Sequence, residues 1–73
     1  MAPSIPPLPF RKVKRLLEQH GFHVLRQRGS HVLFGHADGR STLVPDHRGR
    51  DIPPGLVRKV LRDAKINPDS VRR

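Results

Sequence analysis

Apolar side chains recur at helical spacing in two segments of this chain, and a different pattern separates the two segments. The first segment runs from Phe10 to His20 and has one apolar face opposite a strongly basic one. Pro9 suits the first turn of this helix, and Gly21 suits its C-terminal end. The second segment runs from Pro54 to Lys65, with an apolar stripe formed by Leu56, Val57, Val60, Leu61 and Ala64. We therefore expect two amphipathic helices.

Between these helices the chain has shorter runs of β-branched and other apolar residues, bounded by glycine, proline and aspartate. This pattern predicts three strands, over residues 22–28, 31–36 and 41–44. Gly29 allows a tight hairpin turn between the first two strands, because glycine adopts a positive φ without steric cost. The Asp38-Gly39 pair is typical of the turn that joins the next two strands. Pro45 then ends the third strand.

The predicted order of helix, three strands and helix indicates an α+β fold. Each helix has one apolar stripe to bury, and an antiparallel sheet offers one face on which to bury it. We therefore expect a three-stranded antiparallel sheet with both helices on one face, the layout of double-stranded-RNA-binding domains. Residues 45–53 form a polar loop before the second helix, and residues 67–69 stop that helix or begin a short terminal turn.

Residues 1–9 contain four prolines and no charged side chain, so we predict an extended N-terminal leader. Residues 10–73 are then predicted to form one small domain. The chain has no cysteine, which excludes disulfides and thiol chemistry. No apolar run is long enough for a transmembrane helix or a signal peptide. We expect a cytoplasmic protein with no membrane partner.

The charge of the chain points to a polyanionic partner. Fifteen Lys and Arg oppose six Asp and Glu, which gives a formal net charge of +9. Nucleic acid is the first candidate, a membrane surface the second and an acidic protein the third. Phe10, Phe22 and Phe34 sit at core-like positions, so base stacking is not expected and contact with a nucleic-acid backbone should dominate.

The segment Arg26-Gln27-Arg28-Gly29-Ser30-His31 turns at a glycine and then presents a histidine. Histidine exchanges a proton near neutral pH. The guanidinium of arginine can hold two phosphate oxygens at once. This combination suits chemistry on the RNA backbone, and we predict that His31 is catalytic. The predicted phosphate contacts are Arg26, Arg28 and Ser30. An ordinary surface or half-buried strand histidine is the alternative interpretation of His31.

The loop after the third predicted strand adds weaker candidates. Arg48 and Arg50 can bind phosphate, as can Lys12 on the charged face of the first helix. His47 is a candidate for a second acid or base, although a solvated loop histidine is the more ordinary interpretation. A metal site built from His31, His36 and His47 with an aspartate is not expected, because their spacing matches no ligand motif. We expect no cofactor.

Four short motifs follow one another along the chain: Gly21-Phe22, residues 26–31, Pro45-Asp46-His47 and Pro54-Gly55-Leu56. Their order and spacing resemble those of the HicA toxins, small RNA-cleaving partners in HicA–HicB toxin–antitoxin pairs. The likeness covers about residues 9–66. It implies a fold like that of double-stranded-RNA-binding domains, an mRNA interferase activity that needs no ribosome, and a catalytic histidine at His31. It also implies a cognate HicB-like antitoxin that covers the active site.

Metal-independent cleavage would use the 2′-hydroxyl of the RNA. A base removes its proton, the oxygen attacks phosphorus, and an acid protonates the leaving 5′-oxygen. His31 can serve as base or acid, whereas Arg26 and Arg28 stay protonated and stabilise the phosphoryl oxygens. His47, water and a lysine all stay open as the second proton-transfer group. A non-catalytic RNA-binding module and a basic adaptor for an acidic protein are the competing functions; the first leaves the Gly-Ser-His motif unexplained.

Overall fold

The computed structural model of the protein describes residues 5–71. It has the predicted order of elements, with a short 3-10 helix, η1, after the second α-helix. The elements are α1 (Phe10–Gln19), β1 (His23–Arg28), β2 (His31–Gly35), β3 (Ser41–Pro45), α2 (Pro54–Ala64) and η1 (Pro68–Ser70). The prediction of an α-β-β-β-α chain is therefore confirmed.

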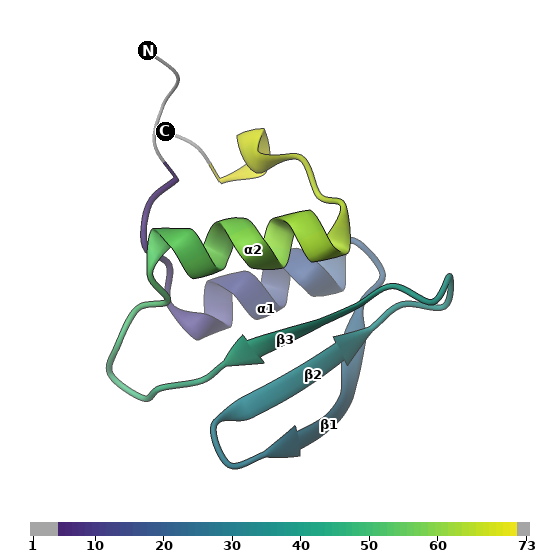
Figure 1. Cartoon of the computed structure of the whole chain (residues 1–73), viewed down its shortest axis with the longest axis horizontal. Helices are drawn as coiled ribbons and strands as arrows, with labels where there is room; N and C mark the ends of the chain where they lie inside the picture. Colours follow the sequence, from purple (N-terminus) through teal and green to yellow (C-terminus); the bar gives the residue numbers. More distant parts are fainter. Residues whose placement is uncertain (1–4, 72–73) are drawn as a thin grey trace.

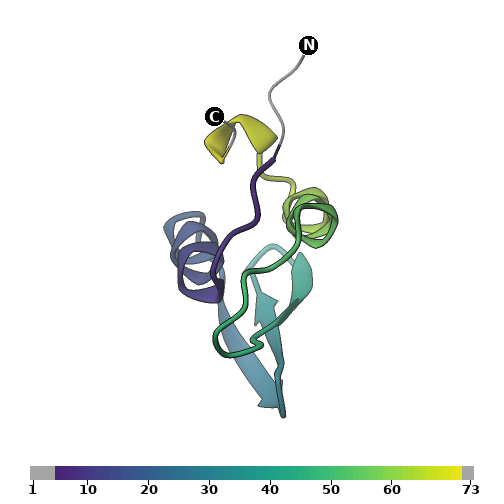
Figure 2. The same ribbon diagram turned by 90° about the vertical axis from the view of Figure 1, so that its left-hand side faces the viewer.

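The three strands form one antiparallel sheet in the order β1-β2-β3. Both α-helices lie side by side over the same face of this sheet, and no helix within residues 5–71 covers the opposite face (Figures 1 and 2). This is the predicted arrangement of double-stranded-RNA-binding domains. It confirms the fold class, and it divides the sheet into a core face and a face free for other contacts.

The core lies between the covered face of the sheet and the two helices. The sheet contributes Val32, Phe34 and Val44, whose side chains are at most 2% exposed. The ring of Phe34 meets the ring of Phe10 with centroids 6.2 Å apart. The helices contribute the predicted apolar stripes, which supply Val13, Leu17, Val57, Val60, Leu61 and Ala64. Burial of these stripes is the main favourable term that holds the helices to the sheet.

The described part of the proline-rich N-terminal segment, residues 5–9, contributes to the same core. Ile5 and Leu8 are 3% and 8% exposed. The backbone N–H of Leu8 donates to the carbonyl of Ile52 at 3.1 Å, and the N–H of Ile52 donates to the carbonyl of Leu8 at 2.6 Å. This reciprocal pair joins the N-terminal segment to the end of the β3–α2 loop. Residues 1–4 of the predicted leader lie outside the described residues.

Arg40 joins the β2–β3 turn to the end of α2. Its guanidinium donates to the backbone carbonyl of Ala64 and pairs with Asp38, with Nε 2.7 Å from Oδ2. It also lies over the ring of Phe22, 5.0 Å from the centroid. The backbone N–H of Arg40, together with its guanidinium and His36, holds the pKa of Asp38 below its ordinary value. The carboxylate therefore stays ionised and keeps Arg40 in place at neutral pH.

Replacing Lys65 with glycine should raise the stability of the fold. Lys65 follows α2 with φ 56° and ψ 40°, a left-handed conformation that costs an L-residue about 1 kcal/mol and glycine almost nothing. The expected gain in the free energy of unfolding is up to about 1 kcal/mol, measured by urea denaturation. Arg62→Gly, inside the same helix, should instead lower it by about 1 kcal/mol. A loss of stability in Lys65→Gly would contradict the strain at this position.

Candidate functional site

The open face of the sheet carries a shallow hollow, called here the sheet hollow, of about 400 Å³. Residues alternate between the two faces of β2, so Val32 and Phe34 face the helices while His31 and Leu33 face outward. In the register of the sheet, Arg28 lies opposite His31, and Arg26 and Leu43 lie opposite Leu33 on either side. These residues line the sheet hollow: Arg26, Arg28, His31, Leu33 and Leu43.

A β-bulge at Leu25 brings the two arginines to this face. Val24 pairs with Phe34 and Arg26 pairs with Leu33, so Leu25 is the extra residue. Strict alternation from Val24 would turn Arg26 and Arg28 toward the helix side of the sheet. The extra residue reverses the alternation and turns both guanidinium groups outward, to the side of His31. This bulge was not predicted from the sequence.

Gly35 makes room for the bulge. A Cβ built on Gly35 would lie 2.5 Å from Cδ1 and 2.9 Å from Cγ of Leu25, a separation that real Cβ atoms do not reach. The Leu25 side chain therefore covers Gly35 on the open face of the sheet, where it is 54% exposed. A glycine inside a strand pattern often marks a bulge or a close approach of another group, and this was the available signal in the sequence.

Gly35→Ala should lower the free energy of unfolding by about 1 kcal/mol, because Leu25 has to leave its place over the strand. Leu25→Ala in the same chain should remove most of that cost, since it removes Cγ, Cδ1 and Cδ2 of Leu25, the three atoms nearest to the methyl group added at position 35. A double-mutant cycle by urea denaturation measures this coupling. Additive effects of the two substitutions would contradict the contact between Leu25 and position 35.

The sheet hollow is electropositive. Among residues 5–71, the ion pairs are His36–Asp38, Arg40–Asp38 and Lys59–Asp63, so neither Arg26 nor Arg28 is neutralised by a carboxylate. His31 is exposed at the start of β2. The structure thus brings together the predicted catalytic histidine and two of the predicted phosphate contacts. An anion that enters this hollow meets two guanidinium groups beside one imidazole.

The β3–α2 loop begins directly beside this site. Pro45 lies opposite His31 in the sheet register, and the backbone N–H of Asp46 donates to the carbonyl of Ser30. Ser30, a predicted phosphate contact, is half-buried in the β1–β2 turn. The same hydrogen bond fixes the turn that precedes His31 to the start of the loop.

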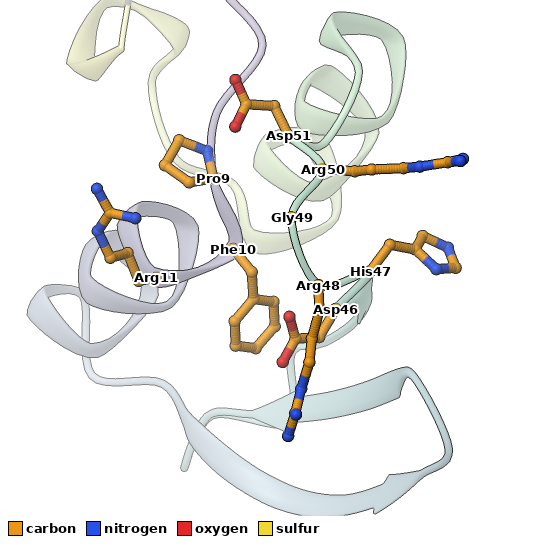
Figure 3. Close-up of a pocket in the computed structure, with 9 residues that line it drawn as sticks. All are labelled: Pro9, Phe10, Arg11, Asp46, His47, Arg48, Gly49, Arg50 and Asp51. Atoms are coloured by element: carbon orange, nitrogen blue, oxygen red, sulfur yellow. The ribbon is translucent and has the colours of Figure 1, made fainter.

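His47 and Arg48 do not line the sheet hollow. They line a second hollow of about 490 Å³, called here the loop hollow, between the start of α1 and the β3–α2 loop (Figure 3). The loop hollow is lined by Pro9, Phe10, Arg11, Asp46, His47, Arg48, Gly49, Arg50 and Asp51. In Figure 3 the rings of Phe10 and His47 point in different directions, with Phe10 toward the hollow and His47 away from it. The structure therefore separates the two candidate histidines into neighbouring sites.

Lys12 lies in neither hollow. It lines a third depression of about 390 Å³ on α1, together with Leu16 of the same helix and with Leu8 and Val71, which lie near the two ends of the described chain. Arg11, its neighbour on α1, lines the loop hollow and was not among the predicted contacts. Their different positions follow from the helical period, which turns successive side chains about 100° apart.

The described residues contain neither a metal-binding cluster nor a membrane-spanning helix. Across residues 5–71, no three histidine, cysteine, aspartate or glutamate side chains come together in a way that could hold a metal ion. Within the same range, neither α-helix has the length and apolar character needed to cross a bilayer.

A comparison with known protein families shows to which family the chain belongs. A family model described as "HicA toxin of bacterial toxin-antitoxin" matches residues 10–66. The chain belongs to the HicA toxin family. The match to the HicA family begins at the first residue of α1 and ends just after α2, so it includes the sheet hollow and nearly all of the loop hollow. The predicted membership is confirmed, and it implies an antitoxin as partner. No curated protein matches the chain significantly.

Proposed function

We propose that this protein is a metal-independent endoribonuclease that cleaves mRNA, with His31 as its catalytic residue. The observation that carries the proposal is the sheet hollow, where Arg26 and Arg28 stand beside the exposed His31 on a face that no helix covers. Membership of a toxin family of toxin–antitoxin systems supports it. The substrate is then in the cytoplasm, where a HicB-like antitoxin also meets the toxin.

The proposed reaction forms one bond to phosphorus and breaks another. The imidazole of His31 accepts the proton of the RNA 2′-hydroxyl, and the 2′-oxygen attacks the adjacent phosphorus. The bond from phosphorus to the 5′-oxygen of the next nucleotide breaks, and that oxygen takes a proton. The products are a 2′,3′-cyclic phosphate and a 5′-hydroxyl. Every step uses protons of the substrate, the protein or water, so the reaction itself requires no metal.

Arg26 and Arg28 stabilise the negative charge that builds on the phosphoryl oxygens. Their guanidinium groups stay protonated throughout, so they contribute electrostatic stabilisation rather than proton transfer. Both come from the edge strand β1, and β2 fixes their distance from His31 through the sheet register. The hydroxyl of Ser30, in the turn directly before His31, can donate a hydrogen bond to a phosphate oxygen.

The proton for the leaving oxygen has two proposed sources. The residues that line the sheet hollow include no second histidine, carboxylate or lysine, and solvent reaches its open side. Water is therefore the simplest donor. His47 becomes the donor only when bound RNA passes over the Ser30–Asp46 contact. A pH–rate profile of His47→Gln separates the two: loss of the limb that requires a protonated group assigns the role to His47.

Cleavage of a purified mRNA in excess EDTA tests the proposal. We expect cut products with 2′,3′-cyclic phosphate and 5′-hydroxyl ends, and no cut at a position where the RNA carries a single 2′-deoxynucleotide. A requirement for Mg²⁺, or products with 5′-phosphate ends, would overturn it.

A non-catalytic RNA-binding module is the second candidate, because the sheet hollow holds only one group able to transfer protons at neutral pH. This alternative predicts RNA binding that weakens steeply with salt but no cut products. The same RNA, followed by both filter binding and gel electrophoresis, distinguishes the two functions.

A further inference from the structure

We infer that the loop hollow is a second phosphodiester-binding subsite, which holds the RNA strand on one side of the bond that is cleaved in the sheet hollow. This inference rests on the proposed ribonuclease function. It assigns a role to Arg11 and Arg50 as well as to Arg48.

Three arginines from two segments line this hollow, and in Figure 3 their guanidinium groups point outward in different directions. Arg11 comes from the first turn of α1, and Arg48 and Arg50 come from the β3–α2 loop (Figure 3). None of the three has an ion-pair partner among the described residues. Asp46 and Asp51 also line the hollow, and in Figure 3 the Asp46 carboxylate lies beside the Phe10 ring, so a phosphate would bind at the rim, where the guanidinium groups lie away from the carboxylates. Unpaired arginines in a concave site are the groups that bind phosphate best.

The loop that carries Arg48 and Arg50 is held in place before any ligand arrives. Its start is fixed by the hydrogen bond from the Asp46 N–H to Ser30, and its end by the reciprocal bonds between Leu8 and Ile52. Between these points, the N–H of Arg50 donates to the carbonyl of His47 at 3.0 Å. Because the backbone is anchored at both ends and in the middle, little loop entropy is lost when a phosphate binds.

The two hollows are neighbours along one path. The Ser30–Asp46 hydrogen bond lies between them: His31 follows Ser30 into the sheet hollow, and Arg48 follows Asp46 into the loop hollow. An RNA chain is continuous, so its backbone has to leave the sheet hollow on each side of the cleaved bond. The loop hollow is the basic surface that adjoins one of these exits. This continuity favours an RNA strand over a separate acidic peptide as the occupant.

The test compares a dinucleotide, which has a single phosphodiester and fills only the sheet hollow, with an oligoribonucleotide of about eight nucleotides around a mapped cleavage site. Arg50→Ala and Arg11→Ala should each lower kcat/KM for the longer RNA about tenfold, the effect of one charged hydrogen bond. Cleavage of the dinucleotide should stay unchanged. Arg62→Ala, an exposed arginine of α2 outside both hollows, is the matched control.

Two binding measurements test the subsite without relying on catalysis. The affinity for octauridylate should fall in the same variants, and its salt dependence should lose about 0.7 in slope for each phosphate contact removed. Asp51→Asn should raise that affinity, because it removes a repelling carboxylate. If the wild-type protein binds octauridylate but cleaves no RNA, the ribonuclease proposal fails. The affinities of the variants for octauridylate still test whether the loop hollow binds RNA.

Three results would overturn the inference. Equal losses on the dinucleotide and the longer RNA would place Arg11 and Arg50 at the reacting phosphate or in the fold. Unchanged RNA binding in both variants would remove the subsite. Unchanged RNA binding together with weaker binding of the antitoxin would assign the loop hollow to the protein partner instead.

Discussion

His31→Ala should lower the rate of RNA cleavage by about 10²–10⁴-fold, the usual contribution of one general acid–base group. The fold should survive, because the side chain of His31 is exposed and the position keeps its backbone pairing with Arg28 and Pro45. Single-turnover cleavage of a defined RNA measures the rate, and circular dichroism with thermal denaturation measures the fold.

His23→Ala is the matched control for this experiment. His23 is also an exposed strand histidine on β1, but it does not line the sheet hollow. Its replacement should leave the cleavage rate within about twofold of the wild-type value, since a remote surface histidine contributes nothing to proton transfer. RNA affinity should change little in His31→Ala, and added imidazole should restore part of the rate. Loss of affinity in step with loss of cleavage would assign His31 a binding role instead.

Phe34→Ala should remove about 3–5 kcal/mol from the free energy of unfolding. Phe34 is fully buried near the end of β2 and contacts Phe10, which begins α1. A domain of this size has a total stability of about 4–11 kcal/mol. The variant should therefore be largely unfolded or close to it, and urea denaturation followed by circular dichroism should show a strongly reduced midpoint.

Phe34→Leu supplies the comparison for that measurement. It keeps most of the buried volume, so we expect a loss of about 1.5 kcal/mol or less. Val24→Ala, at an exposed position on the edge strand, should cost less than either substitution. If Phe34→Ala cost no more than Val24→Ala, the position of the ring at the centre of the core would be wrong.

The fold could be predicted because local patterns and tertiary packing agree. The apolar stripes of the two helices became the buried faces of α1 and α2, and the glycine-containing turns joined the strands as expected. His31 could be singled out because its chemistry and its place after a turn are both visible in one short motif.

The organisation around His31 could not be predicted in the same way. Strict alternation of side chains along a strand predicts that Arg26 and Arg28 lie on the same face of the sheet as Val24. The bulge at Leu25 moves both arginines to the opposite face, and this bulge depends on a tertiary contact between Leu25 and Gly35. The loop hollow is lined by the start of α1 and by the β3–α2 loop, two segments that lie far apart in the sequence. No local pattern relates two such segments, so Arg11 could not be assigned to a site from its neighbours.

The bonds between Leu8 and Ile52 tie the beginning of the chain to the loop that carries Arg48 and Arg50. On the proposed function, this tether makes the ability to process long RNAs depend on the position of residues 5–9. A fusion tag or a truncation that pulls Leu8 away from Ile52 would release the far end of the loop, while the sheet register that sets Arg26, Arg28 and His31 would stay in place. If the proposed ribonuclease and its second subsite are correct, such a protein would still cut short RNAs and would lose the extra rate expected on long ones.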